Sequence, residues 1–283
     1  MKNKSIFLWI LVIAAVLVMA PIEASANTEI LASDNSYVEV DIDGQSGMYL
    51  WKVDNVEQLA TQWFWYRIGN SGPEASINTL SIKDPGNDIK NYGDYLKVKY
   101  TKDNQFTLEI IYVLAGGSTG SHMSDIGETI NIKNISGAAL DFHFFQYTDF
   151  DLSDTPNDDY AFRVTPNSNT ISQQEVGTLF TNPMQFNETI TSPAPSHFQI
   201  AQNSIILTAL TDGLATKLTD TQDNTVGNVS FAWEWDRSIG VGGTFQISKD
   251  KRIGTVPEPS TILLFSLGFL GLGAVGINKR RKI

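Results

Sequence analysis

The sequence contains no cysteine and only 3 histidines among its 283 residues, and basic residues are scarce. Without cysteine, disulfides, thiol catalysis and cysteine-ligated zinc or iron–sulfur sites are excluded. The 31 Asp and Glu residues outnumber the 20 Lys and Arg residues, which gives a net charge of −11. A field of this sign repels nucleic acid and anionic lipid, so we expect no nucleic-acid partner.

Catalytic motifs are also missing. The three histidines, His122, His143 and His197, share no H-x-H or H-E-x-x-H spacing, and no G-x-S-x-G motif is present. His122 lies in a Gly- and Ser-rich loop, His143 in an apolar strand, and His197 after a Pro-rich turn. We expect each histidine to be structural or solvent-exposed, and we expect no enzyme activity. A Ser–His–Asp triad assembled only by folding stays open as an alternative.

The N-terminus has the three parts of a secretory signal. Lys2 and Lys4 precede an apolar run over residues 6–19, and Ala24-Ser25-Ala26 supplies small residues for cleavage. This order predicts a signal peptide over residues 1–26, recognised by signal peptidase at Ala24 and Ala26 and cut after Ala26. A retained N-terminal anchor is the alternative.

The C-terminus combines prolines, an apolar run and a basic tail. Residues 261–277 carry no charge and no proline, and residues 279–282 are all Lys or Arg. As a helix the apolar run would be about 26 Å long, enough to span a bilayer core with help from its flanks. The basic tail should remain cytoplasmic, which places the body across the membrane. The alternative is a buried core helix of a soluble domain.

The C-terminal segment consists of Pro257-Glu258-Pro259, Ser260, the glycine-rich apolar run and the basic tail. In this order it resembles the PEP-CTERM sorting signal of Gram-negative bacteria. The resemblance covers residues 257–283. It implies processing by an exosortase near Pro257, Glu258 and Pro259. It further implies that the helix first holds the protein in the inner membrane, with transfer to the cell surface or extracellular matrix, and that the role is linked to exopolysaccharide and biofilm. A plain C-terminal anchor is the alternative.

The central part of the chain has the pattern of an all-β protein. Without the two ends it contains 14 basic and 29 acidic residues, a net charge of −15. Short alternating segments separated by turns predict a single antiparallel β-sandwich over residues 27–249, with residues 250–256 as a linker. Only residues 55–61 have a helical pattern. The predicted strands are residues 37–42, 48–53, 63–68, 95–101, 106–114, 129–135, 140–150, 161–164, 170–176, 204–211, 228–235 and 244–248.

The densest acidic segment is a candidate calcium site. Asp149, Asp151 and Ser153 alternate and Asp154 follows, as at the start of a calcium-binding loop. The expected glycine at the sixth position and glutamate at the twelfth are absent. The alternative is a solvated strand end and turn, in which Asp, Asn and Pro favour the turn.

Paired tryptophans are a second candidate site. Trp63 and Trp65 alternate on one segment, and Trp233 and Trp235 on another. Exposed rings in this arrangement can stack on sugars, whereas buried rings form core.

Three functions follow from these observations. The first is an exported surface or matrix protein with a structural or binding role. The second is a carbohydrate-binding module, which predicts that some of the four tryptophans lie exposed in a groove. The third is a polysaccharide hydrolase, which predicts two carboxylates or a His–carboxylate pair that converge in a cleft.

Overall fold

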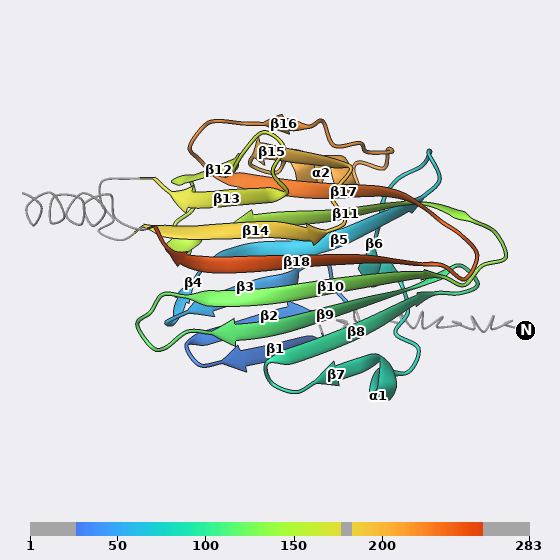
Figure 1. Cartoon of the computed structure of the whole chain (residues 1–283), viewed down its shortest axis with the longest axis horizontal. Coiled ribbons are helices and arrows are strands. Elements are labelled where there is room, and N and C mark those ends of the chain that lie inside the picture. The colour runs from blue at the N-terminus through green and yellow to red at the C-terminus, as the bar shows by residue number, and fades with distance from the viewer. Residues whose placement is uncertain (1–26, 177–182, 257–283) are drawn as a thin grey trace, which may run out of the picture.

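The computed structural model describes residues 27–176 and 183–256, which form two β-sheets packed face to face (Figure 1). One sheet has ten strands and the other has eight. The ten-stranded sheet has the order β1-β2-β3-β5-β11-β17-β15-β16, with β4 on β3 and β6 on β5. Its strands are β1 (Thr28–Ser33), β2 (Ser36–Asp41), β3 (Gly47–Val53), β4 (Val56–Glu57), β5 (Leu59–Ile68), β6 (Ala75–Ser76), β11 (Leu140–Phe150), β15 (His197–Gln202), β16 (Thr221–Gln222) and β17 (Val229–Ile239).

The eight-stranded sheet has the order β12-β13-β14-β18-β10-β9-β8-β7. Its strands are β7 (Ile89–Asn91), β8 (Tyr95–Lys102), β9 (Phe106–Gly116), β10 (Ser124–Asn134), β12 (Asp159–Arg163), β13 (Thr170–Glu175), β14 (Met184–Ser192) and β18 (Thr244–Thr255). Four short helical elements complete the described chain: η1 (Ile77–Thr79), α1 (Pro85–Asp88), η2 (Leu152–Asp154) and α2 (Ile205–Thr211).

The all-β prediction is confirmed, whereas the purely antiparallel arrangement is wrong at two pairings. β15 runs parallel to β16, and β3 runs parallel to β5. The second contact is confined to Gly47 and Met48 opposite Gln62. Gly47 has a φ of +60°, and a Cβ there would lie 2.3 Å from the Gln62 carbonyl oxygen. The two strands can approach only because this residue has no side chain.

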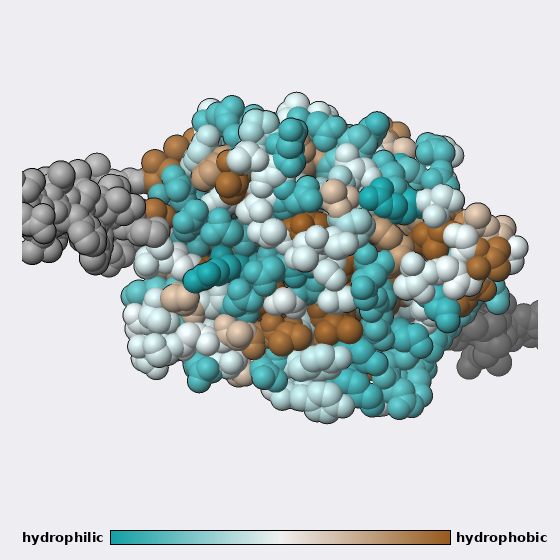
Figure 2. All heavy atoms as spheres, in the orientation of Figure 1, coloured by the Kyte–Doolittle hydropathy of each residue, from teal (hydrophilic) through white to brown (hydrophobic). Residues whose placement is uncertain are grey.

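The core lies between the sheets and is rich in aromatic rings. Phe150 of β11 stacks on Phe186 of β14 with ring centroids 3.8 Å apart. Tyr66 of β5 meets Phe106 of β9 edge-on at 5.1 Å. The strand predicted over residues 106–114 is confirmed as β9, and five alternating apolar residues of this strand are buried: Phe106, Leu108, Ile110, Tyr112 and Leu114. On the outside, Figure 2 shows mostly hydrophilic residues on the visible face, with small apolar patches among them.

Two predicted elements are wrong in type. Residues 204–211, predicted as a strand, contain helix α2, in which Ile206 and Leu210 are buried. These two residues are four apart. Residues at this spacing share a face both in a helix and in a strand, so the pattern is ambiguous. Residues 55–61, predicted as helical, contain β4 and the start of β5. Asp54 and Asn55 both have positive φ, which starts a tight hairpin instead of a helix.

The predicted linker over residues 250–256 is also wrong. β18 continues to Thr255, paired with β10 as far as Ile253 and with β14 as far as Thr255. The Val256 N–H then donates to the Pro183 carbonyl oxygen at 2.9 Å. The strand persists because Ile247, Lys249, Lys251 and Ile253 alternate into the core, so the sandwich ends directly before residue 257.

The predictions for the two ends of the chain lie outside the described residues. These are the signal peptide (1–26), the sorting motif (257–259), the transmembrane helix (261–277) and the basic tail (279–282). Within residues 27–176 and 183–256, no helix has the length and apolar character needed to cross a membrane.

Four charged side chains lie in the core between the sheets. Lys249 and Lys251 of β18, Glu128 of β10 and Glu188 of β14 have fully buried side chains. Lys251 Nζ lies 2.5 Å from Glu128 Oε2, and Lys249 Nζ lies 3.1 Å from Glu188 Oε1 and also pairs with Glu128. The charges cancel, which is the condition under which ions are tolerated in a core.

Two glutamines from the opposite sheet complete this network. Gln62 of β5 donates to Glu128 Oε2 at 3.0 Å, and Gln146 of β11 donates to Glu188 Oε1 at 2.8 Å. Their carbonyl oxygens accept hydrogen bonds from Lys251 and Lys249 respectively. The network therefore ties the two sheets together with polar as well as apolar contacts.

Candidate functional site

The four tryptophans considered for sugar stacking lie in the interior. Trp63, Trp65, Trp233 and Trp235 are between 0% and 3% exposed. Trp63 Nε1 donates to Ser76 Oγ at 2.8 Å, and Trp235 Nε1 donates to the Pro193 carbonyl oxygen at 3.2 Å. The prediction of an exposed aromatic platform is therefore wrong. β5 and β17 are inner strands of their sheet, and both of their faces are covered.

Trp233→Ala should reduce stability without a specific effect on ligand binding. Removal of a fully buried indole leaves a cavity, which costs about 3–5 kcal/mol for Trp→Ala. Urea unfolding followed by circular dichroism would measure the loss. Val241→Ala is the control, because Val241 is 64% exposed and should change stability little. An unchanged midpoint for Trp233→Ala would contradict the packed position of this ring.

The acidic segment considered for calcium does not gather its predicted ligands. Asp149 lies on β11 and accepts a hydrogen bond from Tyr147 Oη at 3.1 Å, whereas Ser153 and Asp154 lie in η2 with positive φ. Among the described residues, the one group of three or more His, Asp and Glu side chains with convergent ligand atoms lies elsewhere. Burial, with a smaller effect of Asp151, raises the pKa of Asp149 to about 7. The calcium prediction for Asp149, Asp151, Ser153 and Asp154 thus finds no assembled ligand set in the described chain.

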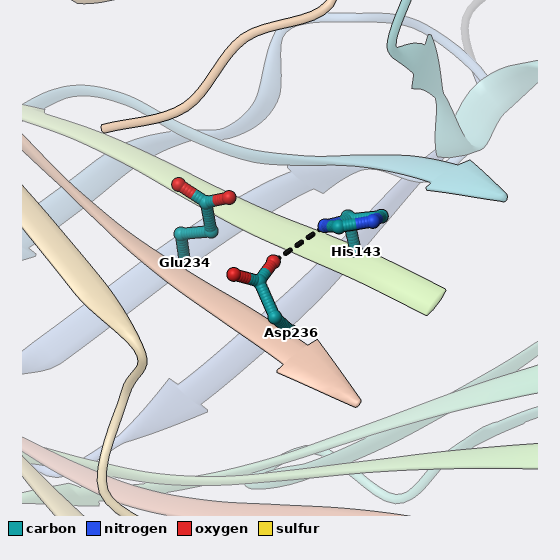
Figure 3. Close-up of side chains that lie close together, drawn as sticks. All are labelled: His143, Glu234 and Asp236. Carbon is teal, nitrogen blue, oxygen red and sulfur yellow. Dashed lines mark hydrogen bonds and ion pairs between the residues drawn. The ribbon is translucent and has the colours of Figure 1, made fainter. Parts of the chain in front are cut away.

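The convergent group is His143, Glu234 and Asp236, on the face of the ten-stranded sheet that points away from the other sheet (Figure 3). Their ligand atoms all lie within 4.8 Å of one another. Antiparallel pairing of β11 with β17 places His143 directly opposite Asp236 and Phe145 opposite Glu234. His143 Nδ1 lies 2.5 Å from Asp236 Oδ1, so the carboxylate orients the imidazole. The sequence predicts a structural or solvent-exposed His143 and does not single out either carboxylate.

The charge state of Glu234 is set by its surroundings. Burial, together with the nearby Asp236 carboxylate, raises the pKa of Glu234 to about 8. Its Oε2 accepts a hydrogen bond from the Leu218 N–H at 2.7 Å. An acid that is protonated near neutral pH thus lies beside a carboxylate–imidazole pair.

An ion pair covers the same face of the sheet. Arg67 of β5, opposite His143, pairs with Glu74 and donates to the Thr216 carbonyl oxygen at 2.9 Å. Both side chains of the pair are buried. The residue 69–76 segment and the residue 216–218 segment therefore shield His143 and Glu234 from solvent.

A chain of polar contacts leads from this cluster to an open groove. His197 Nε2 lies 3.6 Å from Asp236 Oδ2, and His197 Nδ1 lies 2.7 Å from Asp220 Oδ2. Asp220 lines a groove with a volume of about 600 Å³, within the range of small-molecule sites. The groove is lined by Arg163, Val164, Thr165, Pro166, Phe198, Asp220 and Gln222. His122 takes no part in these polar contacts, and its Nδ1 lies 3.6 Å from Asp54 Oδ2.

The cluster has the groups needed for proton transfer. Glu234 can donate a proton near neutral pH, and the His143–Asp236 pair can accept one. The same three side chains have the donor types that bind divalent transition metals. His143 contacts Asp236 through Nδ1, and Glu234 accepts the Leu218 N–H through Oε2. The other polar atoms of the two side chains, His143 Nε2 and Glu234 Oε1, take no part in these two contacts.

Stability should fall as pH rises from about 5 to 8. Burial raises the pKa values of Glu234, Asp159 and Asp149 to about 8, 8 and 7. Since unfolded carboxyl groups release their protons near pH 4, the folded state binds more protons in this window, and its stability decreases with pH. We expect each of the three groups to contribute a loss on the order of 2–4 kcal/mol over this window, measured by urea unfolding at each pH. Glu234→Gln should flatten the profile, and an unchanged slope in this variant would contradict the buried acid.

The chain also carries a C-terminal processing segment. Residues 255–282 match the PEP-CTERM protein-sorting motif, as the resemblance at Pro257-Glu258-Pro259 predicted. The match covers this C-terminal segment alone and defines it as a sorting signal of the PEP-CTERM type. In particular, the PEP-CTERM motif implies processing by an exosortase and a membrane-anchored or cell-surface location.

Comparison with known proteins shows the fold of the β-sandwich and nothing beyond the fold. No curated protein sequence matches the chain. A bacterial glucoamylase solved with acarbose is 10% identical over 88% of this chain, with a TM-score of 0.54. This chain spans 36% of the glucoamylase, so the similarity is to a part of that protein. A provisionally assigned aldose 1-epimerase from Escherichia coli K12 is 10% identical and covers 81% of this chain and 99% of its own, with a TM-score of 0.49.

Proposed function

We propose that this chain is an exported surface or matrix protein whose β-sandwich binds extracellular polysaccharide after exosortase processing. The observation that carries the proposal is the sorting motif at residues 255–282, which begins at the last residue of strand β18. Sorting of this kind delivers a protein to the outside of the cell, where polysaccharide is the abundant polymer. The fold is compatible with this role, because a part of a glucoamylase has the same fold.

The groove beside β15 is the surface we assign to this binding. Asp220 is an exposed acceptor, and Gln222 supplies an amide. Arg163 stacks on Phe198 with its guanidinium carbon 4.3 Å from the ring centroid, so both side chains are held in place. A groove of about 600 Å³ with a few fixed polar groups and one ring is suited to a short stretch of sugar units.

The charge of the body limits the kind of polysaccharide. A net charge of −15 over the central part repels polyanions at the ionic strength of most media. We therefore infer that the polymer is neutral or bears amino groups, and that acidic polymers such as alginate or heparin bind weakly.

Co-sedimentation of the full-length protein in detergent with polysaccharide from the producing cells would test this proposal. We expect the wild-type protein to pellet with the neutral fraction, and the Asp220→Asn, Gln222→Ala variant to lose about tenfold in affinity. Asp103→Asn is the control, since it removes one charge from the exposed turn between β8 and β9, which does not line the groove. Equal pelleting of the groove variant and the control would refute the groove as the binding site.

A second candidate function is acid–base chemistry on a sugar. It is favoured by one observation, the convergence of a protonated Glu234 with the His143–Asp236 pair. The hydrolase hypothesis requires a His–carboxylate pair that converges in a cleft, whereas residues 69–76 and 216–218 cover this pair. Access would require these segments to move. Assays of reducing-sugar release and of anomer exchange, run on wild type and on Glu234→Gln, would test it. If the wild-type protein is inactive in both assays, this function is excluded.

A further inference from the structure

Three buried polar side chains meet where β12 and β13 pair. Asp159 of β12 lies opposite Glu175 of β13. Gln173 precedes Glu175 by two residues and lies on the same face of β13. Asp159 is 1% exposed, Gln173 is 0% exposed and Glu175 is 4% exposed. They lie at the end of the sandwich where β18 ends, because Met184 pairs with Thr255 and its N–H donates to Glu175 Oε2 at 2.6 Å.

One part of each side chain is hydrogen-bonded. Asp159 Oδ2 accepts from the Leu152 N–H at 3.3 Å and from Gln173 Nε2 at 2.9 Å. Gln173 Nε2 also donates to the Phe150 carbonyl oxygen at 2.8 Å. Since both partners of Nε2 are acceptors, the amide cannot be flipped, and its oxygen is fixed on the other side.

The remaining oxygen of each side chain has no donor in the described residues. These atoms are Asp159 Oδ1, Gln173 Oε1 and Glu175 Oε1. Buried acceptors without a donor are rare because they lose water and gain nothing in return. None of the ion pairs in residues 27–176 and 183–256 involves Asp159 or Glu175, so no cation of the described chain compensates them.

We propose that Asp159, Gln173 and Glu175 form a binding site for a divalent cation of the calcium class. Three oxygen donors from adjacent positions of two paired strands, with two negative charges and one neutral amide, match the preference of Ca²⁺ for oxygen ligands and neutralise its charge. Water would complete the six to eight ligands that Ca²⁺ takes. One cation would satisfy all three oxygens at once.

The assignment differs from the calcium site predicted from the sequence. The earlier candidates, Asp149 to Asp154, lie on β11 and in η2 next to this position, since the Leu152 N–H contacts Asp159. They add negative charge near the site. No sequence pattern pointed to Gln173 and Glu175, because only the pairing of β12 with β13 brings them to Asp159.

The chemical competitor of the cation is a proton. Burial raises the pKa of Asp159 to about 8, so a protonated carboxyl could donate one hydrogen bond to a neighbouring oxygen. A single proton on one carboxyl oxygen, donated to a second oxygen, would partner two of the three oxygens and leave the third without a donor. The two occupants therefore differ in stoichiometry, in selectivity and in their response to pH.

Binding of Ca²⁺ to the full-length protein in detergent, after removal of metals with EGTA, tests the proposal. We expect isothermal titration calorimetry to show one Ca²⁺ per chain with a Kd no weaker than about 1 mM, the range of extracellular calcium modules. Ca²⁺ should raise the midpoint of thermal unfolding, and Mg²⁺ should raise it less. The variants Asp159→Asn and Glu175→Gln should lose this response while remaining folded in EGTA.

Gln173→Glu separates coordination from structure. It adds a third charge among buried carboxylates, so in EGTA it should destabilise the protein, and Ca²⁺ should restore the midpoint to that of wild type. Asp103→Asn is the charge control and should respond to Ca²⁺ as wild type does. The proposal is overturned if wild type binds no Ca²⁺, if Asp159→Asn still responds, or if pH alone shifts the midpoint equally with and without Ca²⁺.

Discussion

Cells that produce the Pro257→Ala, Glu258→Ala, Pro259→Ala variant should retain the protein in the membrane fraction. The matched motif supplies two prolines that keep the backbone extended, the form in which a processing enzyme can reach a peptide bond. Loss of the positioned motif should reduce the processed form by about 10²-fold. Fractionation and mass spectrometry of the C-terminal peptide would measure both the location and the terminus.

Ser260→Ala is the matched control for this experiment. It changes the residue directly after the motif and leaves Pro257, Glu258 and Pro259 in place. The control should be processed at the wild-type rate. If the triple variant is released as efficiently as the control, exosortase does not act through these residues, and an anchored periplasmic protein becomes the better description.

Glu128→Gln should be among the most destabilising substitutions in the body. It leaves two buried lysines, Lys249 and Lys251, with Glu188 as the single carboxylate partner in the network. Breaking a buried ion pair from one side costs about 3–5 kcal/mol, because the remaining charge has lost its compensation. Urea unfolding at pH 7 would measure the difference in free energy.

The double variant Glu128→Gln, Lys251→Met is the control that separates charge from packing. It removes one anion and one cation, so the core is neutral again with Lys249 and Glu188 paired. We expect it to be more stable than Glu128→Gln alone. A double variant that is less stable by the sum of two independent losses would show that charge balance is not what holds the network.

Local patterns predicted the strands well where one face is buried. In β8 and β9, polar and apolar residues alternate around a short turn, and the boundaries agree with the structure to within two residues. In α2, two buried residues four apart fit either element, so local pattern could not decide. In β18, Lys249 and Lys251 continue the alternation of Ile247 and Ile253, but charged residues are almost never fully buried, and the strand was read as ending early.

The candidate site was harder to predict than the fold. His143 and Asp236 are 93 residues apart in sequence and meet only through the register of β11 and β17. The same holds for Asp159 and Gln173, which belong to two short paired strands. The one available signal was the pair Glu234 and Asp236, two carboxylates that alternate with tryptophans in an apolar strand. The tryptophans were considered for binding, yet the acids that follow each of them, Glu234 and Asp236, belong to the cluster.

The course of β18 gives the exported protein a defined polarity. Because this strand is hydrogen-bonded up to Thr255, regular sheet structure continues to the point where the sorting-motif match begins. The β10–β11 and β17–β18 loops lie at the other end of the sandwich (Figure 1). The first residues of Asp159–Arg163 and the last residues of Thr170–Glu175 lie at the end where β18 meets the sorting-motif match. The proposed calcium site would therefore tie together the strands at the end of the sandwich that is joined to the sorting signal, and its occupancy would govern how firmly that end is held.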